Sequence, residues 1–505
     1  MSRTVAEVMT APAVTAVASE ALGAAARRME GAGIGSVVVI GENRPIGILT
    51  ERDLLRAAAH GADPSLSTVG EWMTPDPECL EADAPIDEAW RQLGERGYRH
   101  IPVVVGDEFK GIVSMRDLVA LAQLRPAGES AIVAPAGLKG VVVAETELGD
   151  VRGAEGFFHY RQYSAPELAA TRSFESVWEL FVDGDLPSER DDARFRDEIA
   201  RYRAIPEAVT PMLTMVALSS EPMTALRTAL SFVAGAERVR STLGAPAADL
   251  RQDALRLAAV TPTIVAALHR VRSGLAPIAP DPQLGIARDY LRMVHGAEAP
   301  DAEVRALEQY LILALDHGFN ASTFTARVVT STGADMGSAV IAALGALSGA
   351  LHGGAIHRAL DTLDAIGSPE HARAWVRDAI NRGETIMGFG HPVYRTADPR
   401  STMLREVARS LGGARIELAC AVEREVQRAL EDLKPGRPLH TNIEWYAAVV
   451  LERCGLPRDL FTPTFAATRI VGWCAQAMEQ AADNRIIRPS ARYVGPLAPQ
   501  AVPRG

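Results

Sequence analysis

The stretch Ser348–His357, SGALHGGAIH, sets one bulky polar side chain, His352, among small residues. It closes the longest apolar run of the chain, residues 336–351, which is rich in Ala and Gly and falls short of the roughly 20 residues that a membrane span needs. We therefore expect a buried core helix that ends near His352. Small neighbours let a backbone or a ligand approach closely, so this imidazole is the first candidate for chemistry.

Histidines and arginines gather in further segments on both sides of this stretch. These segments are DHGFNAST from Asp316, GFGHPVYRTADPR from Gly388, TNIEWY from Thr441, and the arginines Arg469 and Arg488. With His352 they supply three imidazoles (His317, His352, His391), one carboxylate (Glu444) and three guanidiniums (Arg400, Arg469, Arg488). Because arginine forks match carboxylates bidentately, the set favours a di- or tricarboxylate substrate.

Metal and nucleotide chemistry are the alternatives for these side chains. The three histidines lie 35 and 39 residues apart, with no HxxxH or HExxH pair to begin a metal shell. The chain also lacks the GxxxxGK[ST] loop of a nucleotide-dependent ligase. We therefore expect no metal and no cofactor. Acid–base chemistry remains, such as proton abstraction beside a carbonyl followed by carbon–carbon bond formation.

Together these motifs resemble those of a bacterial-type citrate synthase or 2-methylcitrate synthase over residues 137–505. The matching motifs are DHxxNAST, LHGGA, GFGHPVY…DPR, the TN-apolar-acid-x-Y segment and TxxFAATR, in family order and spacing. The resemblance implies a mainly α-helical citrate synthase fold, in which a large domain flanks a small domain of about residues 357–462 that closes over substrate. It also implies oxaloacetate and an acyl-CoA as substrates, and a homodimer or a higher homo-oligomer.

The resemblance also implies roles for individual residues. Oxaloacetate would be held by His317, Asn320, His391, Arg400, Arg469 and Arg488. Arg488 would reach the site of the other subunit, and Arg395 would contact coenzyme A. His352 would donate a hydrogen bond to the thioester oxygen, His391 would polarise the keto group, and Glu444 would remove the acyl proton. The expected product is citrate from acetyl-CoA, as in the tricarboxylic acid cycle; the close alternative is 2-methylcitrate from propionyl-CoA.

Glu444 departs from the family pattern, which usually has aspartate at this position. One extra methylene displaces the carboxylate by roughly 1 Å, and a misplacement of that size can cost on the order of 100-fold in rate. Ala447 and Ala448 leave room for a shifted helix, so we expect activity to be retained. The alternative is a nucleotide-sensing protein whose synthase domain is weakly active or inactive.

An internal repeat with an offset of 64 residues occupies the N-terminal quarter. GILTERDLL from Gly47 matches GIVSMRDLV from Gly111, and EVMT from Glu7 matches EWMT from Glu71. Each unit predicts an amphipathic helix (residues 21–29 and 86–93), two valine-rich strands and a closing helix. The Thr/Ser-x-x-Asp at the start of the closing helix suits a capping box, or a site for phosphate and ribose, or both.

This repeat resembles a CBS-domain pair, an α/β regulatory module, over residues 1–124. In that family the same pattern lines clefts that commonly bind adenine nucleotides. The resemblance implies a nucleotide site at Thr50, Asp53, Ser114, Arg116 and Asp117. AMP, ADP or ATP would be the effector and S-adenosylmethionine is the alternative, so we expect energy-linked allosteric regulation.

A linker over residues 125–136 separates the two parts, with Arg125-Pro-Ala-Gly at its start. After it, strand signals are confined to residues 140–146, and turns are predicted at Gly149 and Gly153. The predicted fold class is therefore multi-domain: an α/β CBS pair, a linker, and a mainly helical synthase domain over residues 137–505.

Composition narrows the partners and the compartment. A net charge of -11 argues against nucleic acid or an anionic membrane as the main partner. Four cysteines at no metal-ligand spacing predict buried reduced thiols, and the N-terminus lacks an apolar signal region. We expect a cytoplasmic protein.

Overall fold

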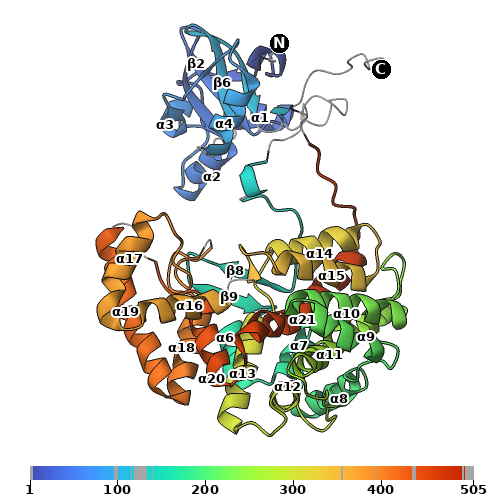
Figure 1. The fold of residues 1–505 in the computed structure, drawn as a ribbon. Coiled ribbons are helices and arrows are strands. Elements are labelled where there is room, and N and C mark those ends of the chain that lie inside the picture. Colours follow the sequence, from blue (N-terminus) through green and yellow to red (C-terminus); the bar gives the residue numbers. More distant parts are fainter. Residues whose placement is uncertain are drawn as a thin grey trace, which may run out of the picture. The chain divides into compact units, whose positions relative to one another are not determined.

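The computed structural model describes residues 4–95, 100–114, 117–118, 134–138, 140–353, 356–391, 393–434, 439–491 and 494. The chain forms two compact units, Met1–Val141 and Val142–Gly505. The first is drawn in blue in Figure 1, and the second runs from green to red.

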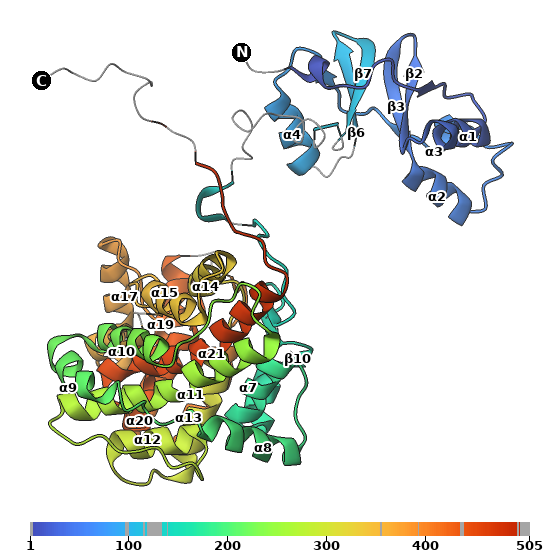
Figure 2. The same ribbon diagram turned by 90° about the vertical axis from the view of Figure 1, so that its right-hand side faces the viewer.

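The N-terminal unit contains two similar halves, each with its own sheet (Figure 2). The first half contains β1 (Thr15–Ala16), α1 (Leu22–Ala32), β2 (Ser36–Gly41), β3 (Arg44–Thr50), α2 (Glu51–Ala59), α3 (Val69–Trp72) and β4 (Thr74–Pro75). The short turn η1 (Val5–Glu7) packs with the second half, where Val5 N donates to Ala84 O. The second half contains β5 (Leu80–Glu81), α4 (Ile86–Glu95), β6 (His100–Val105) and β7 (Glu108–Ser114). Of its closing helix, only Asp117 and Leu118 are among the described residues.

Strand register confirms the internal repeat. In the first half Ser36 pairs with Thr50, and β2 carries an irregularity at Val39/Ile40. In the second half His100 pairs with Ser114, and β6 carries its irregularity at Val103/Val104. Both features recur at the offset of 64 residues. Each half buries its own apolar core, to which every second residue of the central strand contributes: Val37 and Val39 in the first half, Ile101 and Val103 in the second.

The C-terminal unit opens with a small antiparallel sheet of order β10-β9-β8. Its strands are β8 (Gly149–Arg152), β9 (Phe157–Tyr160) and β10 (Tyr163–Ser164). The predicted strand at residues 140–146 is wrong, because residues 141–146 adopt no regular structure and β8 begins where a turn was expected. Val142 is 85% exposed, whereas Tyr160 is buried and donates to the carbonyls of Ile312 (2.8 Å) and Asp316 (3.0 Å). The high strand propensity of the valines at 141–143 did not produce a strand, because these side chains have no surface to pack against.

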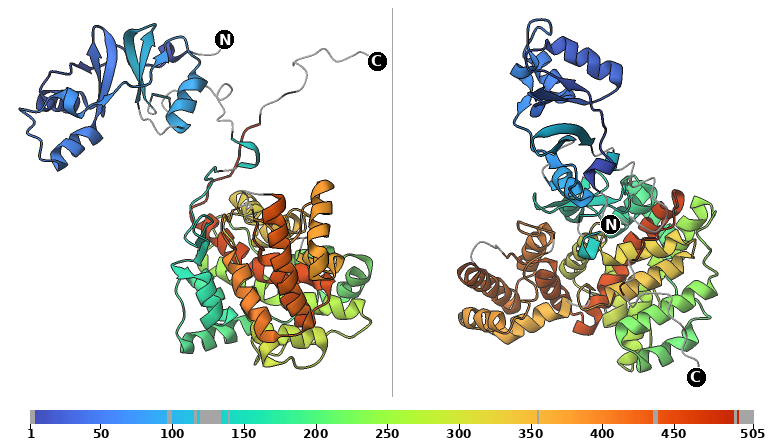
Figure 3. Two further views of the ribbon diagram at one scale, coloured as in Figure 1. Left: turned by 90° about the vertical axis from the view of Figure 1, so that its left-hand side faces the viewer. Right: turned by 90° about the horizontal axis from the view of Figure 1, so that it is seen from above.

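Helices form the rest of this unit in two groups, which Figures 1 and 3 separate by colour. The larger group contains α6 (Ala165–Thr171), α7 (Phe174–Asp183), α8 (Glu189–Ala200), α9 (Thr210–Ser219), α10 (Pro222–Ala236), α11 (Ala247–Arg272), α12 (Ile286–His295), α13 (Asp301–Ala314), α14 (Ala321–Ser331), α15 (Met336–Leu347) and α21 (Phe461–Ala482). The second group, drawn mainly in orange, contains α16 (Ile356–Ile366), α17 (Ala372–Asn381), α18 (Pro399–Leu411), α19 (Ala414–Leu433) and α20 (Ile443–Arg453). The 3-10 turns η2 (Ala136–Leu138), η4 (Pro369–His371) and η5 (Arg458–Leu460) complete the elements.

Two apolar helices, α15 and α11, lie in the core of this unit. The helix predicted before His352 is present as α15, and its apolar face is buried. In length and composition α11 could also cross a membrane, but 78% of its apolar window is buried within the unit. Cys420, Cys454 and Cys474 are buried free thiols as predicted, whereas Cys79 is only half-buried.

Candidate active site

Asn320 and His352 are joined at the start of α14. Asn320 caps the helix, because its Oδ1 accepts from the backbone N–H groups of Ser322 and Thr323, each at 3.1 Å. The Ser322 hydroxyl lies 2.7 Å from that oxygen and 2.8 Å from His352 Nε2. Burial and the Arg469 charge lower the pKa of His352 to about 4. The imidazole is therefore neutral at physiological pH, and one of its nitrogens is held by a hydroxyl.

His391 has its tautomer set by the backbone. Its Nδ1 accepts from the N–H groups of Val393 (3.0 Å) and Tyr394 (3.3 Å), and burial with the Arg400 charge lowers its pKa to about 4. A neutral ring that accepts at Nδ1 carries its proton on Nε2. Nε2 lies 3.3 Å from Arg400 Nη2, which is also a donor. Two N–H donors therefore converge on one place, as an oxygen-bearing anion requires.

Arg400 is held rigidly at the start of α18. Asp398 accepts from its backbone N–H (3.0 Å), from Nε (3.0 Å) and from Nη2 (2.8 Å), and the guanidinium is 3% exposed. Asp398 also accepts from Ile443 N at 3.2 Å, which connects α18 to the start of α20. The Arg400 guanidinium is thus held in place by Asp398, while its Nη2 also faces His391.

His317 and Arg469 line the same region from the larger helix group. His317 Nε2 lies 2.9 Å from the Tyr394 hydroxyl, and its ring centroid is 5.4 Å from that of His391. Burial and the Arg400 charge lower the pKa of His317 well below its usual value. Arg469 is buried in α21, where its Nε donates to Ala314 O at 2.9 Å.

Glu444 lies in the first turn of α20. Asn442 caps the helix by accepting from Glu444 N (3.0 Å), and its Nδ2 donates to Gly390 O (3.0 Å) beside His391. The GFG segment can lie this close because Gly388 and Gly390 both have φ near +85°, and a Cβ on Gly388 would meet Trp445 at 2.8 Å.

One cavity of about 760 Å³ has both Glu444 and His352 in its walls. The same walls also contain Arg358, Gly388, Phe389, Gly390 and Asn442. Burial raises the pKa of Glu444 to about 7, and the charges of Arg400 and Arg358 oppose that rise. Among the residues that the structure describes, none donates a hydrogen bond to the Glu444 carboxylate.

The structure brings most of the predicted residues together, with two exceptions. Contacts or a shared cavity link His317, His391 and Arg400, Asn320 with His352, and His352 with Glu444. Arg469 acts on His317 and His352 through its charge. Arg395 is exposed, and its backbone N–H donates to Gly153 O at 2.9 Å. Arg488 is also exposed; it follows Ile487, whose N–H donates to Ser331 Oγ at 3.0 Å at the far end of α14. An 11-residue helix places that end about 16 Å from Asn320.

Three residues that support the site were not predicted from the sequence. They are Ser322, Asp398 and Tyr394. All three lie inside motifs that were quoted, two or three residues from a predicted side chain. Their short separation in the sequence from predicted His, Asn and Arg residues was the signal that could have identified them.

In the N-terminal unit both Thr/Ser-x-x-Asp patterns form capping boxes. Thr50 N and Oγ1 donate to Asp53 Oδ2 at 2.9 and 2.7 Å, and the corresponding bonds from Ser114 to Asp117 are 2.8 and 2.6 Å. Arg56 lies 3.1 Å from the other Asp53 oxygen. The capping interpretation is confirmed. Arg116 lies outside the described residues.

No cluster of three His, Cys, Asp or Glu side chains suited to a metal ion occurs in the described part of the chain. The donor set of the cavity is instead imidazole, guanidinium and carboxylate. This set can hold an anion, supply neutral hydrogen-bond donors and accept one proton.

Comparison with known proteins places both parts of the chain. The family described as "Citrate synthase, C-terminal domain" matches residues 137–490, and the CBS domain matches residues 5–60 and 69–123. Citrate synthase 2 of Bacillus subtilis is 37% identical over 374 residues, which cover 74% of this chain and 99% of that protein. The 2-methylcitrate synthase of Mycobacterium tuberculosis is 40% identical over 359 residues, which cover 71% of this chain and 90% of that protein.

Solved structures agree with these relatives. The citrate synthase of Thermotoga maritima has a TM-score of 0.65 and 32% identity, and covers 73% of this chain and 97% of its own. The citrate synthase of Thermoplasma acidophilum, solved with carboxymethyl coenzyme A and oxaloacetate, has a TM-score of 0.68 and 29% identity, covering 73% and 98%. The predicted fold class, a CBS pair followed by a mainly helical synthase, is confirmed. The chain therefore belongs to the citrate synthase family, as an enzyme of that family preceded by a pair of CBS domains.

Proposed function

We propose that this enzyme condenses acetyl-CoA with oxaloacetate and water to give citrate and coenzyme A. The single observation that carries the proposal is the shared cavity of Glu444 and His352, beside the converging donors of His391 and Arg400. A carboxylate able to accept a proton thus faces a neutral donor. The anion-binding groups lie next to both.

Oxaloacetate binds first to the guanidiniums and amide that line the site. Arg400 and Arg469 pair with its carboxylates, since guanidinium forks match carboxylate geometry, and Asn320 and His317 complete the binding set. The Nε2–H of His391 points at the keto oxygen. It polarises the carbonyl without adding a full charge to the pocket, because the ring is neutral.

Proton abstraction from the thioester is assigned to Glu444. The carboxylate takes a proton from the acyl methyl group while the Nδ1–H of His352 donates to the thioester oxygen, where negative charge develops. For His352 to carry its proton on Nδ1, its Nε2 must accept from the Ser322 hydroxyl 2.8 Å away, which requires that hydroxyl to turn its one hydrogen from Asn320 Oδ1 to the imidazole. A base with a pKa of about 7 is well matched to neutral solution.

Carbon–carbon bond formation follows at the keto carbon of oxaloacetate. The enol carbon attacks that carbon, the keto oxygen gains a proton from the His391 side of the site, and the coenzyme A thioester of citrate results. Water then cleaves the thioester to release citrate and coenzyme A. Glu444 performs the role for which the family usually has aspartate, with its first turn of α20 tied back to the Gly390 carbonyl through Asn442.

Propionyl-CoA is the second candidate substrate, because the 2-methylcitrate synthase relative is 40% identical. The test is release of the coenzyme A thiol from each thioester, with and without oxaloacetate. We expect release that depends on oxaloacetate and is faster with acetyl-CoA. Faster release with propionyl-CoA would replace citrate by 2-methylcitrate as the product. No release from either thioester would favour the inactive nucleotide-sensing alternative.

A homodimer would complete the site, with Arg488 supplied by the second subunit. Exposed apolar side chains on α9 and α10 support a covered face there: Met215 and Leu218 are each 67% exposed and Phe232 is 47% exposed. Complementation provides the test. Mixing the Glu444→Gln and Arg488→Ala variants should restore activity, because a hybrid dimer carries one intact site; a mixture as inactive as its components would contradict the shared site.

The CBS pair would regulate the enzyme by binding an adenine nucleotide near Thr50, Asp53, Ser114 and Asp117. A nucleotide shifts the open and closed populations of the catalytic cleft only by its differential affinity for them. We expect AMP, ADP or ATP to change kcat or KM of the full chain, and S-adenosylmethionine is the alternative effector. Identical kinetics with and without all four ligands would remove this regulatory role.

A further inference from the structure

A second glutamate lies behind the candidate base and touches both of its flanks. Glu423, in α19, is 2% exposed. Its Oε1 accepts from the Thr441 hydroxyl at 2.8 Å, and its Oε2 accepts from the Tyr446 hydroxyl at 2.5 Å. Thr441 lies three residues before Glu444 and Tyr446 two residues after it. One buried carboxylate therefore holds the first turn of α20 from both sides.

The same contacts continue to the helix that carries Arg400. The Ser401 hydroxyl donates to Thr441 Oγ1 at 3.0 Å, and Arg405 Nη1 lies 3.6 Å from Glu423 Oε2. Because a threonine hydroxyl has one hydrogen, Thr441 donates it to Glu423 and accepts from Ser401. The directions of all three bonds are thus fixed. Glu423 connects α18, α19 and α20, yet it lies outside the walls of the cavity.

We propose that Glu423 is a positioning residue that sets how far Glu444 reaches toward the acyl group. The inference rests on the proposed role of Glu444 as the base. Hydrogen bonds to a charged acceptor are short and strong, so two of them leave α20 little freedom to slide along α19. A side chain one methylene longer than aspartate needs its backbone fixed at a matching distance. A slip of roughly 1 Å would cost on the order of 100-fold in rate.

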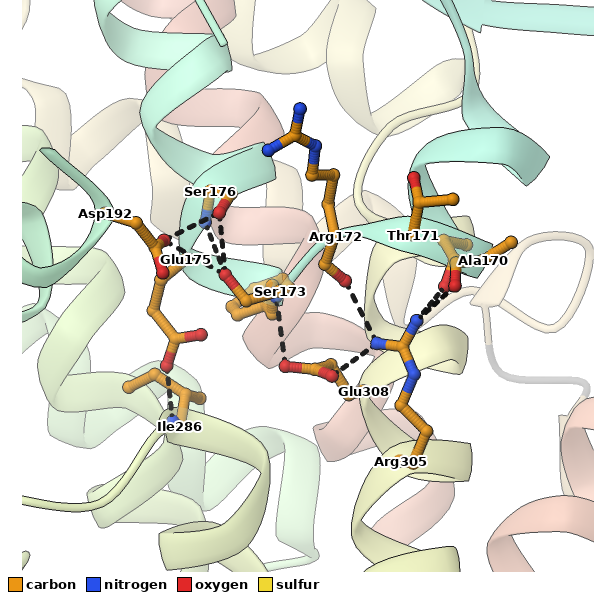
Figure 4. Close-up of polar contacts among 12 residues, drawn as sticks. Ala170, Thr171, Arg172, Ser173, Glu175, Ser176, Asp192, Ile286, Arg305 and Glu308 are labelled. Carbon is orange, nitrogen blue, oxygen red and sulfur yellow. Dashed lines mark hydrogen bonds and ion pairs between the residues drawn. The ribbon is translucent and has the colours of Figure 1, made fainter. Parts of the chain in front are cut away.

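Glu175 provides a matched control, because it is also a glutamate with 2% exposure. Its carboxylate accepts from Ile286 N at 2.6 Å at the start of α12. Figure 4 shows Glu175 near two groups of polar contacts: Ser173 and Ser176 with Asp192, and Arg305 with Glu308. No residue of the candidate active site takes part in the contacts drawn there. Removing charge at Glu175 therefore disturbs a buried carboxylate without disturbing α20.

The experiment compares Glu423→Gln, Tyr446→Phe and Glu175→Gln in the full chain. The readouts are kcat, KM, oxaloacetate affinity by calorimetry, melting temperature, and the primary isotope effect on kcat with methyl-deuterated acetyl-CoA. For Glu423→Gln we expect kcat to fall by about 10- to 100-fold, with oxaloacetate affinity unchanged and the isotope effect raised, because proton abstraction becomes slower. Tyr446→Phe should show a smaller change in the same direction, and it serves as the test if Glu423→Gln does not fold. Glu175→Gln should leave kcat and the isotope effect unchanged.

Two outcomes would overturn the inference separately from the proposed function. If the wild-type enzyme is active but Glu423→Gln and Tyr446→Phe retain its kcat and isotope effect, Glu423 has no positioning role and the proposed function stands. A loss of kcat that only tracks a lowered melting temperature, with an unchanged isotope effect, leads to the same conclusion. A wild-type enzyme that releases no coenzyme A overturns the proposed function, and this inference with it.

Discussion

Glu175 and Glu444 are both buried glutamates, but their carboxylates have different hydrogen-bond partners. Desolvation raises the pKa of both side chains. At Glu175 a hydrogen bond from Ile286 N at the start of α12, where the helix dipole favours negative charge, opposes part of that rise. Glu444 receives no such bond from any described residue and faces the cavity with His352. Perturbed pKa values are frequent at functional sites, and of these two carboxylates only Glu444 faces the cavity, which supports its proposed role as the base.

The largest expected effect comes from removing the base. Glu444→Gln keeps the size of the side chain but cannot accept the acyl proton, so kcat should fall by about 10²- to 10⁴-fold. Oxaloacetate affinity should stay unchanged, because its proposed ligands are other residues. Steady-state kinetics and calorimetry measure the two quantities. Full turnover in this variant would remove the distinction between Glu444 and Glu175.

A smaller effect is expected from the hydroxyl that holds His352. Ser322→Ala should lower kcat by about tenfold, since His352 would lose the hydroxyl that lies at its Nε2 and is proposed to keep its proton on Nδ1. Thr325→Ala is a matched control in the same helix, because its hydroxyl only donates to Ala321 O. Equal kinetics in both variants would show that Ser322 does not set the tautomer.

The smallest kinetic effect is expected at Glu175, where the cost should appear in stability. Glu175→Ala leaves the Ile286 N–H and the start of α12 without their acceptor, so the free energy of unfolding should fall by about 1–3 kcal/mol. We expect kcat to remain within about twofold of wild type, because Glu175 has no contact with the site. Chemical denaturation and steady-state kinetics check the two parts. A large loss of kcat in Glu175→Ala under conditions where the variant is fully folded would contradict the distinction between Glu175 and Glu444.

Where local patterns carried the information, the sequence predicted the structure well. The offset of 64 residues between repeats reappears as matching strand register, and the apolar run before His352 is the core helix α15. Motif identity predicted a convergence that the structure shows for His317, His391 and Arg400 and for His352 with Glu444, but not for Arg488; the roles given to these residues stay predictions. The helix caps by Asn320, Asp398 and Asn442 explain how those side chains are placed.

What the sequence could not supply depends on tertiary neighbours. Valines at 141–143 predicted a strand, but the sheet formed where Phe158 and Tyr160 had a core to enter. Glu423 has no motif around it, and its importance appears only once Thr441 and Tyr446 are seen on either side of Glu444. Arg488 stayed a prediction because its role requires a second subunit.

The pH dependence of kcat/KM for the acyl-CoA tests most directly whether the Glu444 carboxylate is the base. The pKa of Glu444 is raised to about 7, so its proton-accepting form is present above that pH and is lost as pH falls through it. His352 and His391, with pKa values lowered to about 4, stay neutral across this range. We predict a one-proton decline below pH 7 in the wild type, about tenfold between pH 8 and pH 6, and a flat profile for the residual activity of Glu444→Gln. A wild-type rate that stays constant down to pH 5, or the same decline persisting in Glu444→Gln, would contradict the assignment.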